Sequence, residues 1–358
     1  MCKKFFLLVL LALSPGFILS FGQPGGRNSF TSLTFPQSAR ISSMGGKLNA
    51  ILDNDLALAG QNPALLNKSM HMHLSSNLVR FPAGIQYGYF SYSYHHKKYG
   101  SFASGFQYAN YGSFKQADNT GSITGEFFAA DYVFHLMWSH ALPDSAFRIG
   151  ISAKPLLSFY ESYNSFALGF DIGITYNNPE NRFTSTLLLK NIGRQFSSFS
   201  KKINEPLPFE IQMGLSHKLS HAPLRFSLVA QQLQNPDLTY DQPEEENTQV
   251  FGDETDNNSN EGFFSYADHL MRHIILGTEL ILTENLFFRI GYNYQQRQQL
   301  NIETNTFSTV GFSWGFGLKI KTFQVSYARS NYHLAGTPNF VSISTNLKET
   351  YNWGHKLF

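Results

Sequence analysis

Serine and histidine come nearest to a chemical pattern in this 358-residue chain. Gly311-Phe-Ser-Trp-Gly315 matches the G-x-S-x-G motif, in which a nucleophilic serine occupies a turn between a strand and a helix. Here the following residues alternate between apolar and polar as far as Lys321, which is typical of a continuing strand. We therefore expect Ser313 to be an ordinary strand residue.

Two pairs of histidines could in principle bind a metal ion. His71 and His73 would share one face of a strand, and His95 and His96 precede a turn. No cysteine or set of carboxylates accompanies either pair in the sequence, although a zinc site needs three or four ligands. We interpret these histidines as polar strand or interface residues, and we expect no enzymatic activity, metal site or cofactor.

Charged residues concentrate in two segments that we expect to be long connections. Residues 235–261 are acidic and poor in apolar side chains, and they include Glu244, Glu245 and Glu246. Their spacing lacks the glycine and the terminal glutamate of a calcium-binding loop, which favours a solvated loop. Residues 191–206 carry Arg194, Lys201 and Lys202. Both segments are our candidates for contact with a partner protein.

The composition indicates which elements must position these loops. Charged residues make up 15% of the chain, against about 25% in soluble domains, and aromatic residues also reach 15%. The mean hydropathy of -0.22 argues against a bundle of membrane helices. The net charge of +2 is too small to indicate binding to nucleic acid.

A period of two dominates from about residue 70. In the clearest segment the alternate residues Phe166 to Tyr176 are apolar, and those between them are mostly small or polar. Similar stripes begin at Phe147, Leu207, Leu286, Phe316, Phe323 and Val341, and the stripes starting at Leu207, Leu286 and Val341 extend to Leu215, Tyr294 and Leu347. Such segments predict an all-β, transmembrane antiparallel barrel of roughly fourteen strands. A large soluble β-sandwich is the alternative, because its strands also alternate.

The first residues have the features of a secretory signal. Lys3 and Lys4 precede an apolar run from Phe5 to Leu13, and small residues near Gly22 offer a cleavage site. The single cysteine, Cys2, lies before the apolar run, so we expect neither lipidation nor a disulfide. We divide the chain into a signal peptide (1–22), an N-terminal segment (23–69) and a barrel (70–358).

The N-terminal segment breaks the strand pattern. Residues 45–66 are small, apolar and helix-compatible, with Gly45 and Gly46 at the start and Asn62 before Pro63. Asp53 and Asp55 add an acidic pair. We expect a short helical segment that either folds into the lumen as a plug or lies against the mouth of the barrel.

These residues resemble the N-terminal signature of FadL-like outer-membrane barrels, in which a Gly/Ala-rich stretch, an acidic pair and an Asn-Pro-Ala motif precede the first strand. Later motifs are similar to the PorQ family of barrels from the type IX secretion system. The motifs are Phe102-Ala-Ser-Gly-Phe-Gln-Tyr-Ala-Asn-Tyr-Gly112, Thr124-Gly-Glu126, Lys190-Asn-Ile-Gly193, Pro206-Leu-Pro-Phe-Glu-Ile-Gln212, Lys218-Leu-Ser-His-Ala-Pro223 and Asp268-His-Leu-Met-Arg-His273. Phe358 ends the chain, but the alternate positions Asn352, Gly354 and Lys356 depart from the apolar pattern of terminal barrel strands.

The resemblance implies a non-catalytic role in the outer membrane, with loops at the cell surface. It implies that the barrel anchors a PorZ-like surface protein in one complex with a PorV barrel and a PorU sortase, which attaches cargo to lipopolysaccharide. The broader FadL-like resemblance implies an alternative function, the transport of hydrophobic small molecules.

Overall fold

The structure is a computed structural model that describes residues 29–81, 84–143, 146–197, 199, 205–238, 261–300, 309–331 and 337–354. The predicted signal peptide, Lys201, Lys202 and Glu244 to Glu246 lie outside these residues.

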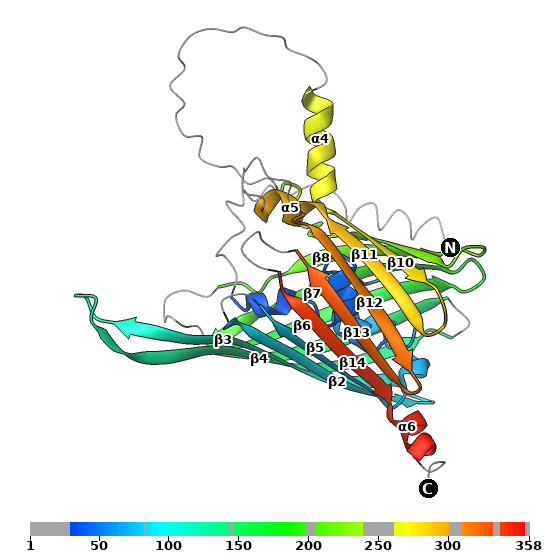
Figure 1. The fold of residues 1–358 in the computed structure, drawn as a ribbon, viewed down its shortest axis with the longest axis horizontal. Helices are drawn as coiled ribbons and strands as arrows, with labels where there is room; N and C mark the ends of the chain where they lie inside the picture. Colours follow the sequence, from blue (N-terminus) through cyan, green and yellow to red (C-terminus); the bar gives the residue numbers. More distant parts are fainter. Residues whose placement is uncertain are drawn as a thin grey trace.

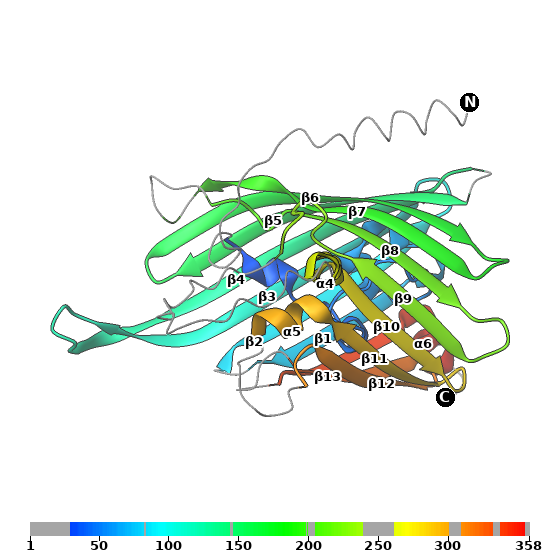
Figure 2. The ribbon, with the colours of Figure 1, turned by 90° about the horizontal axis from the view of Figure 1, so that it is seen from above.

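Fourteen antiparallel strands form a closed barrel, as predicted (Figures 1 and 2). Each strand pairs with its neighbours in sequence, and β1 closes the barrel by pairing with β14, from His73 opposite Asn346 to Arg80 opposite Asn339. The strands are β1 His73–Arg80, β2 Gln86–His96, β3 Gly100–Ala117, β4 Ile123–Ala141, β5 Phe147–Tyr160, β6 Tyr163–Asn178, β7 Phe183–Ser197, β8 Glu210–Lys218, β9 Leu224–Ala230, β10 Ile274–Ile281, β11 Leu286–Asn293, β12 Phe312–Ile320, β13 Phe323–Ser330 and β14 Asn339–Asn346.

The two faces of the wall meet different surroundings. On β6, Phe170, Ile172 and Ile174 point outward and are about 40% exposed, whereas Asp171 and Thr175 point inward and are buried. The other strands repeat this alternation, so the outer surface is a continuous apolar belt. An exposed belt of this kind is stable only in contact with lipid, which identifies a membrane-spanning barrel.

The ends of the barrel differ. At one end, which we call the short-turn end, short connections join successive strands in pairs, from β2 and β3 to β12 and β13. Examples are residues 97–99, 282–285 and 321–322. The other end, here the long-loop end, carries helix α4 Glu261–Arg272 and helix α5 Tyr294–Leu300 (Figure 1). The hairpin formed by β3 and β4 projects past the neighbouring strands at this end (Figure 1).

Residues 30–70, here called the plug, lie inside the barrel, where the strands surround them (Figure 2). Their helices are short: η1 Thr31–Thr34, α2 Ala39–Ser43, α3 Ala57–Gln61, η2 Pro63–Leu65 and η3 Lys68–Met70. The expectation of one helical segment over residues 45–66 is therefore correct only for part of that range, because residues 45–55 are not helical. Among the described helices, none is long and apolar enough to cross a membrane.

Four residues assigned to strands by their pattern lie elsewhere. Leu207 and Phe209 precede β8, and Leu207 packs inside against Phe30 and Leu33 of the plug. Tyr294 begins α5, and Leu347 begins a last helix, α6 Leu347–Gly354. Alternation in sequence cannot locate a strand end, because the same residue types continue into the helix.

Helix α6 also accounts for the polar positions near the C-terminus. Strand β14 ends at Asn346, whose side chain accepts hydrogen bonds from the backbone N–H groups of Lys348 and Glu349 at 3.0 and 3.2 Å. Asn352 and Gly354 thus belong to a helix and not to a lipid-facing strand. Lys356 and Phe358 lie outside the described residues.

Candidate functional site

Local capping explains why the plug is a series of short turns. The Ser38 hydroxyl accepts a hydrogen bond from the Ile41 N–H at the start of α2. Asn62 caps η2 in the same way by accepting from the Ala64 N–H at 3.0 Å, and Pro63 occupies the first helical position, where no N–H is needed. Asn67 repeats the cap for η3 through the Ser69 N–H at 2.8 Å. Each cap starts a new turn and limits the preceding one.

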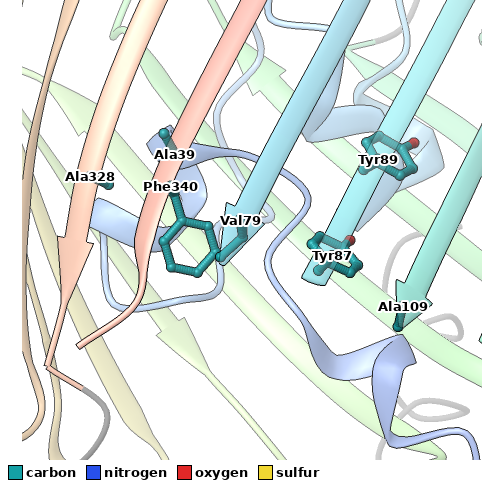
Figure 3. Close-up of a cluster of buried hydrophobic side chains, with 7 residues drawn as sticks. All are labelled: Ala39, Val79, Tyr87, Tyr89, Ala109, Ala328 and Phe340. Carbon is teal, nitrogen blue, oxygen red and sulfur yellow. The ribbon is translucent and has the colours of Figure 1, made fainter. Parts of the chain in front are cut away.

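The plug carries an apolar core of its own and also packs on the wall. Ile41, Met44, Leu48, Leu58 and Leu65 cluster together and are fully buried. On one side, Ala39 of α2 lies among wall side chains that include Phe340 and Val79 (Figure 3). Each Å² of apolar surface removed from water contributes about 25 cal/mol, so these contacts favour a plug held inside the lumen.

Wall glycines make room for the backbone of the plug. A Cβ atom on Gly150 would overlap Pro63 and Ala64, and one on Gly173 or Gly214 would overlap the side-chain oxygen of Asn62 or Asn49. On β11, a Cβ on Gly291 would overlap Gly45 and Met44. These glycines occupy inward positions on four strands, β5, β6, β8 and β11, so they form a seat for the plug.

A buried ion cluster joins the plug to the wall. Arg40 donates to Asp53 at 2.8 Å and to Asp55 at 3.2 Å within the plug, and to Glu279 of β10 at 3.0 Å. Glu279 also accepts from Arg225 of β9 at 2.9 Å and from Arg289 of β11 at 2.8 Å. We call these six residues the Arg40 cluster. A buried charge is tolerated only when it is paired, so the plug and wall depend on each other for neutrality.

Asp53 shows the electrostatic effect of this arrangement. Burial alone would raise its pKa, but the Arg40 and Arg225 guanidinium groups outweigh burial and hold the pKa of Asp53 well below its ordinary value. Arg225 donates to the same carboxylate at 3.2 Å. Asp53 therefore remains ionised in the folded protein at neutral pH.

Further polar contacts fix the plug along the lumen. Lys47 pairs with Glu210 of β8, and Asn49 donates to Gln212 at 3.0 Å. Near the other end of the plug, the Ser32 hydroxyl donates to the buried carboxylate of Asp131 on β4 at 2.8 Å. The plug is thus attached to several separate strands.

Comparison with solved structures finds outer-membrane barrels among the similar chains. The barrel is similar in fold to FadL-type barrels. The toluene transporter TodX of Pseudomonas putida is 11% identical, with a TM-score of 0.47 over 87% of this chain and 96% of that chain. A FadL homologue of Pseudomonas aeruginosa is 10% identical, with a TM-score of 0.46 over 87% and 98%. The CymD monoaromatic hydrocarbon channel is 12% identical, with a TM-score of 0.46 over 87% and 97%.

No protein-family model matches the chain, and no curated protein matches its sequence. The likeness to the solved barrels concerns the fold alone.

The structure shows where the residues of the predicted plug motif lie. Gly45 and Gly46 have φ of 91° and 90°, values that favour glycine, and the Gly45 N–H donates to the Ser313 hydroxyl at 3.0 Å. Asp53 and Asp55 meet at Arg40, whereas Asn62 and Pro63 lie near β5 and β6. All six residues are in the plug, but they contact different parts of the wall, and their role in function stays a prediction.

Arg194 is the described member of the predicted contact loops, and its assignment to a loop is wrong. It belongs to β7, where it pairs with Leu168 and points outward, with its guanidinium 5.1 Å from the centre of the Phe196 ring. The strand continues because a bulge near Asn191, which has a φ of 57°, shifts the register and keeps pairing to Ser197. The connection therefore begins after residue 197.

The serine and histidine residues that were candidates for catalysis or metal binding make contacts within the fold. Ser313 lies within β12 and faces the plug, as expected for a strand residue. The His71 ring packs at a tilt against Tyr94 with ring centres 5.0 Å apart, and its Nδ1 accepts from the His95 N–H at 3.1 Å. No group of three or more metal-binding side chains occurs within the described residues.

The sequence patterns singled out Asp53 and Asp55 but neither Arg40 nor the wall members of the Arg40 cluster. Arg225, Glu279 and Arg289 occupy inward positions. The outward neighbours of the two arginines are apolar, and those of Glu279 are Thr278 and Leu280. A charge at an inward position of a barrel strand is a usable signal, because it needs a partner within the lumen. The identity of that partner depends on how the plug folds.

Proposed function

We propose that this chain is a non-catalytic outer-membrane barrel of the PorQ type, which anchors a type IX secretion attachment complex at the cell surface. The proposal rests on the motifs that resemble the PorQ family and, in the structure, on one observation. Helix α4 stands away from the barrel at the long-loop end (Figure 1), and its residues Leu270 and Met271 are exposed.

The base of α4 is firmly held. Asp268 accepts hydrogen bonds from Arg272 at 2.7 Å and from the Tyr294 hydroxyl of α5 at 2.5 Å. His269 Nδ1 lies 3.3 Å from Oδ1 of Asp237, a residue that follows β9. Leu270 is 50% exposed and Met271 is 38% exposed on this helix. A helix that is bonded at its base and exposes apolar side chains suits the docking of a protein.

The projecting β3–β4 hairpin offers a second surface at the same end. Its strands have 18 and 19 residues, well above the 9–11 that a membrane crossing needs. Phe128 is 68% exposed, and Phe114 stacks on Phe127 with ring centres 5.3 Å apart. This surface supports a role in holding partners outside the bilayer.

In this function the long-loop end faces the cell surface, since barrel loops are longer outside than in the periplasm. The expected partners are a PorZ-like surface protein, a PorV barrel and a PorU sortase, beside lipopolysaccharide. The filled lumen and the buried Arg40 cluster favour a fixed anchor over an open pore.

The experiment replaces Leu270 and Met271 together by serine in the native chromosome. We expect the PorZ-like protein to be released into the medium and to be lost from affinity purifications of the barrel. The control is Leu282→Ser, which removes a side chain of similar exposure, 49%, at the short-turn end. Retention of the PorZ-like protein after deletion of the whole gene would contradict the proposal.

Transport of hydrophobic small molecules is the second candidate, and one feature of the wall favours it. The β4–β5 ladder pairs Val133 with Leu156 and resumes at Leu136 with Ala153, so it skips Pro155, which has no N–H to donate. Behind the interruption lie the apolar residues Leu156, Val133 and Phe30. A weak point in the wall beside an apolar interior is suited to a lateral exit.

Uptake by liposomes separates the two functions. Purified barrel in liposomes would take up a monoaromatic hydrocarbon if it is a transporter, and Leu156→Asp would reduce the rate. An anchor would show no uptake above that of empty liposomes, and it would still copurify with its surface protein.

A further inference from the structure

A cavity of about 270 Å³ lies at the short-turn end, between the plug and the wall. Its lining includes Arg40 and Asp53 of the plug, Lys218 at the end of β8, Arg225 of β9 and Arg289 of β11. Glu284, in the exposed turn between β10 and β11, lies at its edge. The cavity thus brings four cationic side chains to one space.

The buried carboxylates around this space already have their hydrogen bonds. Both oxygens of Asp53 accept from Arg40, and one accepts from Arg225 as well. One oxygen of Glu279 accepts from Arg289, and the other accepts from Arg40 and Arg225. These acceptors have little capacity left for additional donors.

The cationic groups, in contrast, keep unused donors. Within the described part of the chain, Arg40 Nε is buried without a hydrogen-bond partner. The hydrogen bonds of Arg225 to these same residues all come from Nη1, which leaves Nη2 and Nε available to a ligand. Among the contacts of the described residues, the Lys218 ammonium forms no ion pair. A cavity with surplus charged donors and saturated acceptors favours a ligand that supplies oxygen acceptors and negative charge.

We propose that this cavity binds a phosphate-type oxyanion, either free phosphate or the phosphate of a lipid headgroup. Such an anion offers several oxygens to donors that approach from different strands, which a carboxylate with two oxygens matches less well. Glu284 opposes the ligand through its like charge and sets an upper limit on affinity. The proposal does not depend on the function proposed above.

The test measures binding of inorganic phosphate to the purified barrel in detergent, by calorimetry in a phosphate-free buffer. Saturable binding is expected for the unmodified protein. Lys218→Gln should weaken it roughly tenfold or more, since it removes a charged donor. Glu284→Gln should strengthen it. Lys97→Gln, which removes a lysine from another turn at the same end, should leave affinity unchanged.

Two outcomes overturn the proposal. One is the absence of saturable binding by the unmodified protein. The other is equal affinity in Lys218→Gln and Lys97→Gln, which would indicate an adventitious ion only. If Lys218→Gln folds poorly, Glu284→Gln still tests the proposal. Removal of this negative charge strengthens binding at an anion site, whereas a site that prefers cations would lose affinity.

A second arm distinguishes the sources of the anion. The barrel is placed in nanodiscs that contain phosphatidylglycerol, and lipid retained after transfer to detergent is counted by native mass spectrometry. Retention by the unmodified protein and loss in Lys218→Gln would assign the site to a lipid headgroup. Phosphate binding without lipid retention would assign it to a soluble phosphate compound.

Discussion

The Arg40 guanidinium in the plug donates a hydrogen bond of 3.0 Å to the Glu279 carboxylate in strand β10, 239 residues further along the chain. Both side chains are almost fully buried, at 6% and 1% exposure. Glu279 accepts from three arginines, two of them in the wall. This single carboxylate therefore connects the plug to strands β9, β10 and β11.

Replacement of Glu279 tests this connection. Glu279→Gln leaves three buried guanidinium groups short of one negative charge, and we expect a loss of about 3–5 kcal/mol in the free energy of unfolding. The measurement is the temperature at which the folded band disappears on gels of unheated and heated samples. Glu284→Gln, in an exposed turn, should change stability by less than about 0.5 kcal/mol. Equal midpoints for the two variants would contradict a coupled cluster.

The glycine seat predicts that a single methyl group disturbs the plug. In Gly150→Ala the new Cβ would overlap backbone atoms of Pro63 and Ala64, and we expect about 1–3 kcal/mol of destabilisation together with a displaced plug. Displacement should appear as larger or more frequent current steps in planar bilayers. Gly88→Ala is the control, since its Cβ would meet its nearest neighbour at 3.5 Å, an ordinary contact. Identical currents in both variants would count against the seat.

Acid should weaken the attachment of the plug through Asp53. The pKa of Asp53 is lower in the folded than in the unfolded protein, so its contribution is present above the unfolded value of about 3.9 and is lost as pH falls toward the folded value. We expect the unfolding midpoint to drop between pH 5 and pH 3, and to drop less in Asp53→Asn. The midpoints are measured by tryptophan fluorescence in urea. An equal drop in the two proteins would show that other carboxylates carry the effect.

The apolar belt predicts that the destabilisation caused by a lysine substitution depends on its depth in the membrane. Ile290, in the middle of β11, is 61% exposed, and Ile320, at the end of β12, is 55% exposed. Ile290→Lys should destabilise the barrel by about 2–4 kcal/mol, and Ile320→Lys by about 0–1 kcal/mol, because lysine at the interface keeps contact with water. Urea unfolding in lipid vesicles gives both values. Equal effects would argue against a membrane boundary near Ile320.

The sequence by itself determined an all-β fold of alternating strands. Alternation such as that of Phe170 and Asp171 specifies two different surroundings for neighbouring residues, and turn residues mark most strand ends, so roughly fourteen strands follow from local pattern. The closure of β1 on β14 decided for the barrel and against the sandwich. The local pattern could not locate the ends at Tyr294 and Leu347, where helices begin, or show that Arg194 stays in a strand, because bulges and caps depend on the neighbouring strand.

The tertiary structure alone decided what the interior contains. Asp53 and Asp55 were visible as an acidic pair, but their partner Arg40 joins them only when the plug turns back on itself, and Glu279 joins only when the barrel closes around it. Buried charges are paired through space, and no local pattern encodes which distant residues meet. The wall glycines have the same explanation, since their small size is required by a segment about a hundred or more residues away in sequence.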